Sequence, residues 1–251
     1  MNVSWRALAT ALIICLFQQA AVAAEIRVLS IPGVKAALDQ LKPSFEREHR
    51  HELAIRYEIY PRQKEQIDAG NFDVAIFAKP LIADLVTQGK AVAGSTSEIA
   101  RTSIGVAVRK GAPKPDISNE EAFKRTLLAA KSITYTKESQ TGVHVTRLLD
   151  RFGIADQVRD KAILQPGGNM TTPAVADGKA ELAIVLVSDI VAHPGVDLVG
   201  PLPASIQNHV VQVAAVGTNA KDVGAAAALI KFLTSAAAAE AFKAAGLETG
   251  R

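Results

Sequence analysis

Short apolar runs alternate along this chain with segments whose apolar residues recur at helical spacing. The runs are rich in Val and Ile and are four to eight residues long, which is typical of buried strands. We predict strands at residues 26–31, 53–60, 74–78, 104–108, 133–136, 182–187 and 210–216.

Helical spacing is clearest in three segments that lie between or after these runs. Val34, Leu38, Leu41 and Phe45 fall on one helical face, and residues 142–152 repeat the pattern. Residues 223–245 are so rich in alanine that helix propensity alone predicts a single long helix there. The alternation predicts an α/β fold with mixed, mainly parallel sheets and helices on both faces.

The first 24 residues have the pattern of a secretory signal peptide. Arg6 precedes an apolar stretch over 7–17, and small residues at 21–23 form a cleavage site. We therefore expect a periplasmic protein that begins near Glu25; a buried N-terminal helix of a cytosolic protein is the alternative. Cys15 would leave with the leader, and Ile14 before it is too large for a lipidation signal.

Charge and composition exclude several classes of function. Loss of Arg6 lowers the formal net charge from +3 to +2, and no stretch combines clustered basic residues with aromatics, so we expect no nucleic-acid partner. His49 and His51 are two residues apart, which suits no metal on a helix. We expect no metal, no cofactor and a monomer.

Hydroxyl and amide residues precede several predicted helices. Pro32 and Pro173 suit a first helical turn, and the free amides of such a turn attract anions. If the strands bring these helix starts together, they would form one anion site; the alternative is that each residue is an ordinary N-cap. The residues expected there are Ser30, Ser139, Thr141, Asn169, Thr171 and Thr172.

Four segments resemble a known family. They are the strand 26–29 with the helix end at 44–46, residues 66–74, residues 178–185 and the tail 227–235. From Glu25 to Leu247 the pattern is similar to the periplasmic solute-binding proteins of ABC importers, most closely to the molybdate-binding branch of the type II fold.

The resemblance implies two α/β lobes with a ligand cleft between them. The first lobe would comprise residues 25–104 and 207–251, and the second residues 105–206. Such a protein closes on its ligand by a hinge motion and delivers it to a membrane permease.

The chain departs from this branch at the ligand positions. Gly33 replaces a serine, Ile59 and Tyr60 replace a Ser-Ser pair, and Leu186 replaces a tyrosine. Arg62 instead offers a planar fork that matches a carboxylate, although it could also be a solvated surface arginine. With Tyr60 as a further donor, we predict a small di- or tricarboxylate as ligand in place of molybdate.

An enzymatic alternative rests on the same resemblance. Some periplasmic aconitate isomerases resemble molybdate-binding proteins, and their reaction needs an acid or base beside carboxylate sites. His144, near the start of the helix 142–152, is the candidate, because a helix start favours the neutral imidazole. The alternative is a surface or packing histidine.

Overall fold

The computed structural model describes residues 24–59 and 61–249, so the predicted signal peptide and Tyr60 lie outside the described residues. The strands are β1 (Glu25–Ser30), β2 (Glu52–Tyr57), β3 (Val74–Ala78), β4 (Ser97–Arg109), β5 (Ile133–Thr136), β6 (Ala162–Gln165), β7 (Leu182–Leu186), β8 (Val196–Pro201) and β9 (His209–Val216). The α-helices are α1 (Lys35–His49), α2 (Arg62–Ala69), α3 (Lys79–Thr87), α4 (Glu120–Ala129), α5 (Gln140–Phe152), α6 (Ala155–Arg159), α7 (Gly168–Ala176), α8 (Val187–Val191), α9 (Val223–Leu233) and α10 (Ala236–Ala244). Short 3-10 helices are η1 (Pro32–Val34), η2 (Ala93–Ser95) and η3 (Ala204–Ile206).

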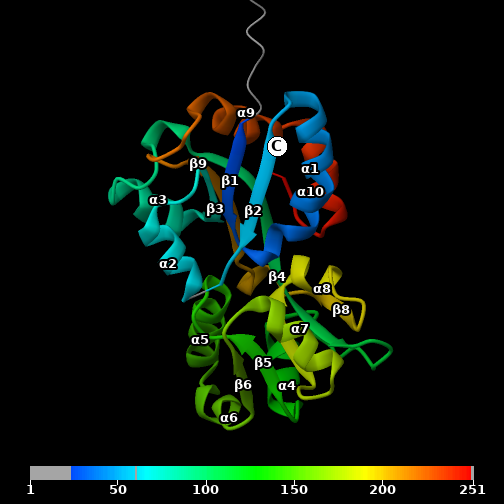
Figure 1. Cartoon of the computed structure of the whole chain (residues 1–251). Helices are drawn as coiled ribbons and strands as arrows, with labels where there is room; N and C mark the ends of the chain where they lie inside the picture. The colour runs from blue at the N-terminus through cyan, green and yellow to red at the C-terminus, as the bar shows by residue number, and fades with distance from the viewer. Residues whose placement is uncertain (1–23, 60, 250–251) are drawn as a thin grey trace, which may run out of the picture.

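Two lobes stand one above the other, as Figure 1 shows. The first contains β1, β2, β3 and most of β9, with α1, α9 and α10 on one side and α2 and α3 on the other. The second contains β5 to β8 with α4 to α8. The two-lobed α/β fold that the sequence predicts is confirmed, with parallel pairs β1–β2, β1–β3, β5–β6 and β5–β7 in the two lobes.

The long strand β4 carries the chain from one lobe to the other. It pairs with β9 over Ser97–Ser103 and with β7 over Ile104–Ala107, in both cases antiparallel. The antiparallel pairings of this molecule therefore involve the crossing strands β4 and β9. The lobe boundaries at 104 and 206 stay a prediction.

Each lobe has its own apolar core. Phe45, Phe232 and Phe242 pack between the sheet of the first lobe and its helices, and Phe72 and Phe77 fill the opposite face. In the second lobe, Phe123 and Phe152 pack edge to face in a core that also contains residues of β5 and β7. Because separate cores stabilise the lobes, ligand contacts between them need not contribute to folding.

Five local features of the structure differ from the prediction. The stretch 223–245 forms two helices, because Ser235 caps α10 by accepting a hydrogen bond from the Ala238 N–H at 3.2 Å. Helix α7 begins at Gly168, so Pro173 lies inside it and not at its first position. The prediction at 104–108 missed the first half of β4, and β6 and β8 were also missed.

No single helix in the described part of the chain is long and apolar enough to cross a membrane. Helices α9 and α10 reach that length and composition only as a pair, and they are bent by 63° at their junction.

Candidate ligand cleft

The starts of three helices from both lobes meet at one cavity of about 150 Å³. From the first lobe come Pro32 and Gly33 of η1, and from the second come Ser139 before α5 and Gly168 in the first turn of α7. Pro32 has no N–H group, so the free N–H groups and the partial positive charge come from the first turns of α5 and α7, whose first amides have no partner inside the helix. This arrangement suits a small anion.

The turn from β5 into α5 is tight, and Gly142 explains how. A Cβ at this position would collide with the carbonyl oxygen of Thr136, so only glycine lets the helix start approach the end of the strand. Ser139 caps this helix: its Oγ accepts from the Gly142 N–H at 3.0 Å and donates to the Thr136 carbonyl at 3.4 Å. The hydroxyl of Ser139 is thus already engaged at the wall of the cavity.

The two lobes touch across the cleft. Ile59, which follows β2, lies against Gly167, since a Cβ there would be 3.1 Å from the Ile59 Cγ2 atom. Leu186, at the end of β7, faces Gly33 in the same way at 3.6 Å. Apolar side chains therefore meet glycines of the opposite lobe on both sides of the cleft.

The structure brings some of the sequence-predicted ligand residues to this cavity and keeps others away. Gly33, Ser139, Thr141 and Asn169 line it. Thr172 is buried and lines a neighbouring cavity of about 320 Å³. Ser30 and Thr171 are fully buried and line neither cavity, and the Thr171 hydroxyl donates to the Gly167 carbonyl.

Arg62 and His144 lie outside the cavity. Arg62 is exposed at the start of α2, so its placement fits the surface arginine that the sequence left open. The His144 Nε2 atom lies 2.7 Å from the Ile206 carbonyl oxygen. His144 lines a separate cavity of about 490 Å³ between the lobes, together with Lys79, Arg147 and His209.

Sequence reasoning missed Asp189, which lies on the wall of the cleft in the first turn of α8. Burial raises the pKa of Asp189 to about 7. No hydrogen bond or ion pair reaches its carboxylate from any residue that the structure describes. A signal was present: Asp189 lies two residues after the apolar run 182–187, near the carboxyl end of a strand, where α/β proteins bind ligands.

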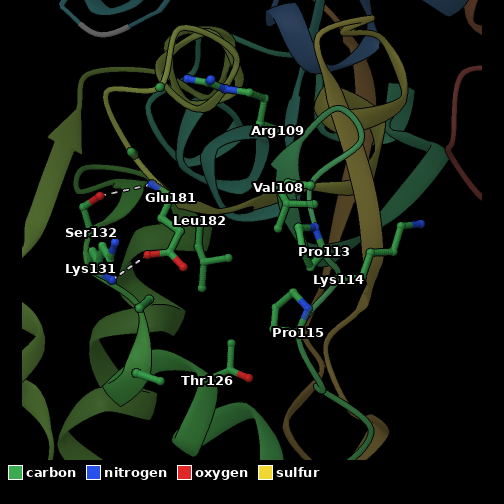
Figure 2. Close-up of a pocket in the computed structure, with 15 residues that line it drawn as sticks. Val108, Arg109, Pro113, Lys114, Pro115, Thr126, Lys131, Ser132, Glu181 and Leu182 are labelled. Carbon is green, nitrogen blue, oxygen red and sulfur yellow. Dashed lines mark hydrogen bonds between the residues drawn. The ribbon is translucent and has the colours of Figure 1, made fainter.

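A larger hollow of about 660 Å³ lies in the second lobe alone, away from the helix starts. Its polar groups do not converge, as Figure 2 shows: Lys114 extends outward from one rim, and Glu181 on the other accepts from the Lys131 N–H at 2.6 Å. We therefore place the ligand site in the smaller cavity between the lobes. Among the described residues, no group of three or more His, Cys, Asp or Glu is arranged to hold a metal.

Comparison with known proteins agrees with this architecture. A family model described as bacterial extracellular solute-binding protein matches residues 26–248, and the chain belongs to this family.

The relatives include both a binding protein and an enzyme. An aconitate isomerase of a Pseudomonas species is 31% identical over 232 residues, which cover 89% of this chain and 87% of that protein. The molybdate-binding protein ModA of Azotobacter vinelandii is 26% identical over 98% of both chains. A solved structure of the periplasmic molybdate-binding protein of Azotobacter vinelandii superposes with a TM-score of 0.75 at 20% identity, covering 90% of this chain and 100% of that one.

Proposed function

We propose that this protein is a periplasmic solute-binding protein that captures a small organic carboxylate and delivers it to an ABC-type importer. The observation that carries the proposal is the convergence of η1, α5 and α7 on one cavity between the lobes. Free amides at these helix starts would receive the carboxylate oxygens. A cleavable leader at residues 1–24 would deliver the protein to the periplasm.

The choice of a carboxylate over molybdate rests on the cleft lining. Gly33, Ile59 and Leu186 are without hydroxyl groups, so the cleft has fewer side-chain donors for a compact tetrahedral oxyanion. Apolar side chains at these positions suit instead the carbon skeleton of an organic acid, whose carboxylates would contact the helix starts.

A thermal-shift screen of the protein purified from the periplasm tests this proposal. The screen would contain molybdate, tungstate, sulfate, citrate, tricarballylate and both aconitates. A ligand at 100 times its Kd stabilises the folded state by about 2.7 kcal/mol. For a protein of this size that raises Tm by roughly 5 to 10 °C.

We expect a shift with at least one di- or tricarboxylate and none with molybdate. Submicromolar affinity for molybdate in calorimetry would contradict the proposed ligand class. Binding of no organic acid at all would contradict the carrier function as stated.

A second candidate function is isomerisation of an unsaturated tricarboxylate, which the similarity to an aconitate isomerase supports. In this reaction one group removes a proton from the methylene carbon, the double bond moves, and a proton returns to the former vinyl carbon. His144 is the candidate from sequence. Asp189 is a second candidate, because its pKa near 7 suits a group that both accepts and donates a proton.

Proton NMR of cis-aconitate incubated with the protein distinguishes the two functions. An unchanged spectrum supports the carrier. If the trans isomer accumulates, the leading proposal is wrong. The variants His144→Ala and Asp189→Asn then identify the acid or base, because replacing the residue that transfers the proton abolishes turnover and leaves ligand binding intact.

A further inference from the structure

The charges around the cleft cavity are unusual for a site that receives an anion. Three carboxyl groups line it, from Glu58, Glu138 and Asp189, and the described lining residues include no Lys, Arg or His. Helix starts attract an anion, whereas three ionised carboxylates would repel it. The cavity can hold an organic anion more readily if at least one of these groups is neutral.

Asp189 is the carboxyl group that lies between the two lobes. A Cβ on Gly168, in the first turn of α7, would collide with the Asp189 Oδ2 atom, and a Cβ on Gly33 of η1 would lie 3.8 Å from Oδ1. Asp189 also lines the neighbouring cavity that Thr172 reaches. Its carboxyl group therefore lies beside the helix starts where a bound carboxylate would be held.

The groups around Asp189 do not supply a counter-ion. The elements packed against α8 include β4, β8, α7, β7 and η1. Of these, α7, β7 and η1 contribute no charged side chain to the cleft. The charged residues of β4 and β8 line neither of the two cavities that Asp189 lines; they are Glu98, Arg101, Arg109 and Asp197. The charged or titratable groups that share its two cavities are Glu58, Glu138, Lys35, Asp39 and His193.

Both basic groups in this set are engaged elsewhere. Lys35 pairs with Asp39 and lies over the ring of Tyr57, 4.7 Å from its centroid. The Nδ1 atom of His193 accepts from the Gly195 N–H at 3.1 Å. Burial without a cationic partner raises the pKa of Asp189 to about 7, so near neutral pH about half of the molecules carry the proton.

We propose that Asp189 is the specificity-determining residue of the cleft and that it donates its proton as a hydrogen bond to the bound carboxylate. The cleft then binds the anion only when Asp189 carries a proton, because ionised Asp189 repels the anion. This inference rests on the proposed function, because it requires a carboxylate ligand in this cleft.

The expected pH dependence has a definite sign. Below pH 7 the free protein already carries the proton, so the affinity is highest and nearly constant there. Above pH 7 each binding event must take up a proton, so Kd rises by up to tenfold per pH unit. Between pH 6 and pH 8.5 a group with a pKa of about 7 produces a rise in Kd of about 30-fold.

Isothermal titration calorimetry with tricarballylate tests the inference. This saturated tricarboxylate cannot be isomerised, so binding is measured without turnover. Titrations at pH 8 in HEPES and in Tris, which differ in ionisation enthalpy, give the number of protons taken up per ligand. We expect about 0.9 for the wild type. The variant Asp189→Asn keeps a donor but cannot titrate, so we expect no proton uptake and equal affinity at pH 6 and pH 8.5.

Asp84→Asn is the matched control, since it makes the same substitution at an exposed position of α3. It should keep the full pH dependence of the wild type. If the wild type binds tricarballylate with equal affinity at pH 6 and pH 8.5, or if Asp189→Asn keeps the proton uptake, this inference is wrong while the proposed function stands. If tricarballylate, citrate and both aconitates fail to bind at pH 6, the proposed function itself fails.

Discussion

Asp73 is buried and Asp189 is partly buried, and the chain surrounds the two carboxyl groups in opposite ways. Asp73 begins the buried run into β3 in the first lobe and is 2% exposed. It accepts hydrogen bonds from Arg27 Nε at 2.9 Å, Arg27 Nη2 at 2.7 Å, and the N–H groups of Arg27 and Lys221, both at 2.8 Å. Asp189 accepts no hydrogen bond from the described residues.

The two pKa values differ accordingly. Burial alone would raise the pKa of Asp73, but the hydrogen bonds from Arg27 and Lys221 outweigh burial and lower it. At Asp189 burial acts alone and raises the pKa to about 7. Burial is therefore not what separates a structural carboxylate from a functional one. The difference lies in whether the fold supplies donors, and where it supplies none the carboxyl group can keep its proton and donate it to a ligand.

The largest effect is expected from removing the satisfied carboxylate. Asp73→Ala leaves the guanidinium of Arg27 and two backbone N–H groups without their acceptor. We expect the free energy of unfolding to fall by about 3 to 5 kcal/mol, the usual effect of breaking a buried ion pair. Urea denaturation measures this change.

Asp84→Ala, on the exposed face of α3, is the control and should change stability by less than about 0.5 kcal/mol. A loss below about 1 kcal/mol for Asp73→Ala would show that the four hydrogen bonds contribute little, and the contrast with Asp189 would lose its basis.

At Asp189 the opposite sign is expected. Its pKa in the folded state is raised from 3.8 to about 7, so the folded protein binds the proton more tightly than the unfolded chain does. The contribution of Asp189 to the free energy of unfolding therefore falls as the pH rises from about 4 to 7. A full shift of this size corresponds to about 4 kcal/mol, and because the side chain is partly exposed we expect Asp189→Asn to stabilise the protein by about 1 to 3 kcal/mol at pH 8.

The stabilisation by Asp189→Asn should vanish near pH 4, where the wild-type carboxyl is neutral in both states. Asp73 should show the reverse slope, since its lowered pKa contributes stability that is lost as the solution becomes acidic. Urea midpoints for Asp189→Asn and wild type at pH 5, 6.5 and 8 measure the first slope. A variant that is equally stable with wild type at all three values would mean that burial does not perturb this carboxyl group.

Strands buried on both faces could be predicted from the sequence. Residues Val74–Ala78 and Ile133–Thr136 were predicted to the residue, because parallel strands covered by helices need continuous apolar runs. Strands β6 and β8 were not predicted, since their residues are partly exposed and no long apolar run marks them. The first half of β4 is mostly polar or charged, with only Ile99 and Ala100 apolar, and its role depends on pairing with distant β9.

Part of the cavity lining could be predicted from the sequence, but the surroundings of Asp189 could not. Helix starts near Pro32 and Ser139 were identified from hydroxyl and proline residues, which are local signals, whereas the start of α7 was predicted at Pro173 and lies at Gly168. The isolation of Asp189 depends on Gly33 and Gly168, which are distant in sequence, and on the pairing of Lys35 with Asp39. Contacts of this kind are defined by the tertiary fold alone.

The smallest effect separates a helix cap from a ligand donor within the cleft itself. Ser139 caps α5 beside the cavity, and Ser235 caps α10 in the first lobe, each accepting a hydrogen bond from the N–H three residues on. Replacing either serine by alanine should lower the free energy of unfolding by about 1 kcal/mol. Because the Ser139 hydroxyl is already engaged with Gly142 and Thr136, we expect backbone amides to hold the anion. Ser139→Ala should then change the affinity for tricarballylate at pH 6 by less than about threefold, as Ser235→Ala should, since an engaged cap has no free donor. A loss of more than tenfold for Ser139→Ala alone would instead assign its hydroxyl to the ligand and bring this part of the cleft closer to the molybdate-binding relatives.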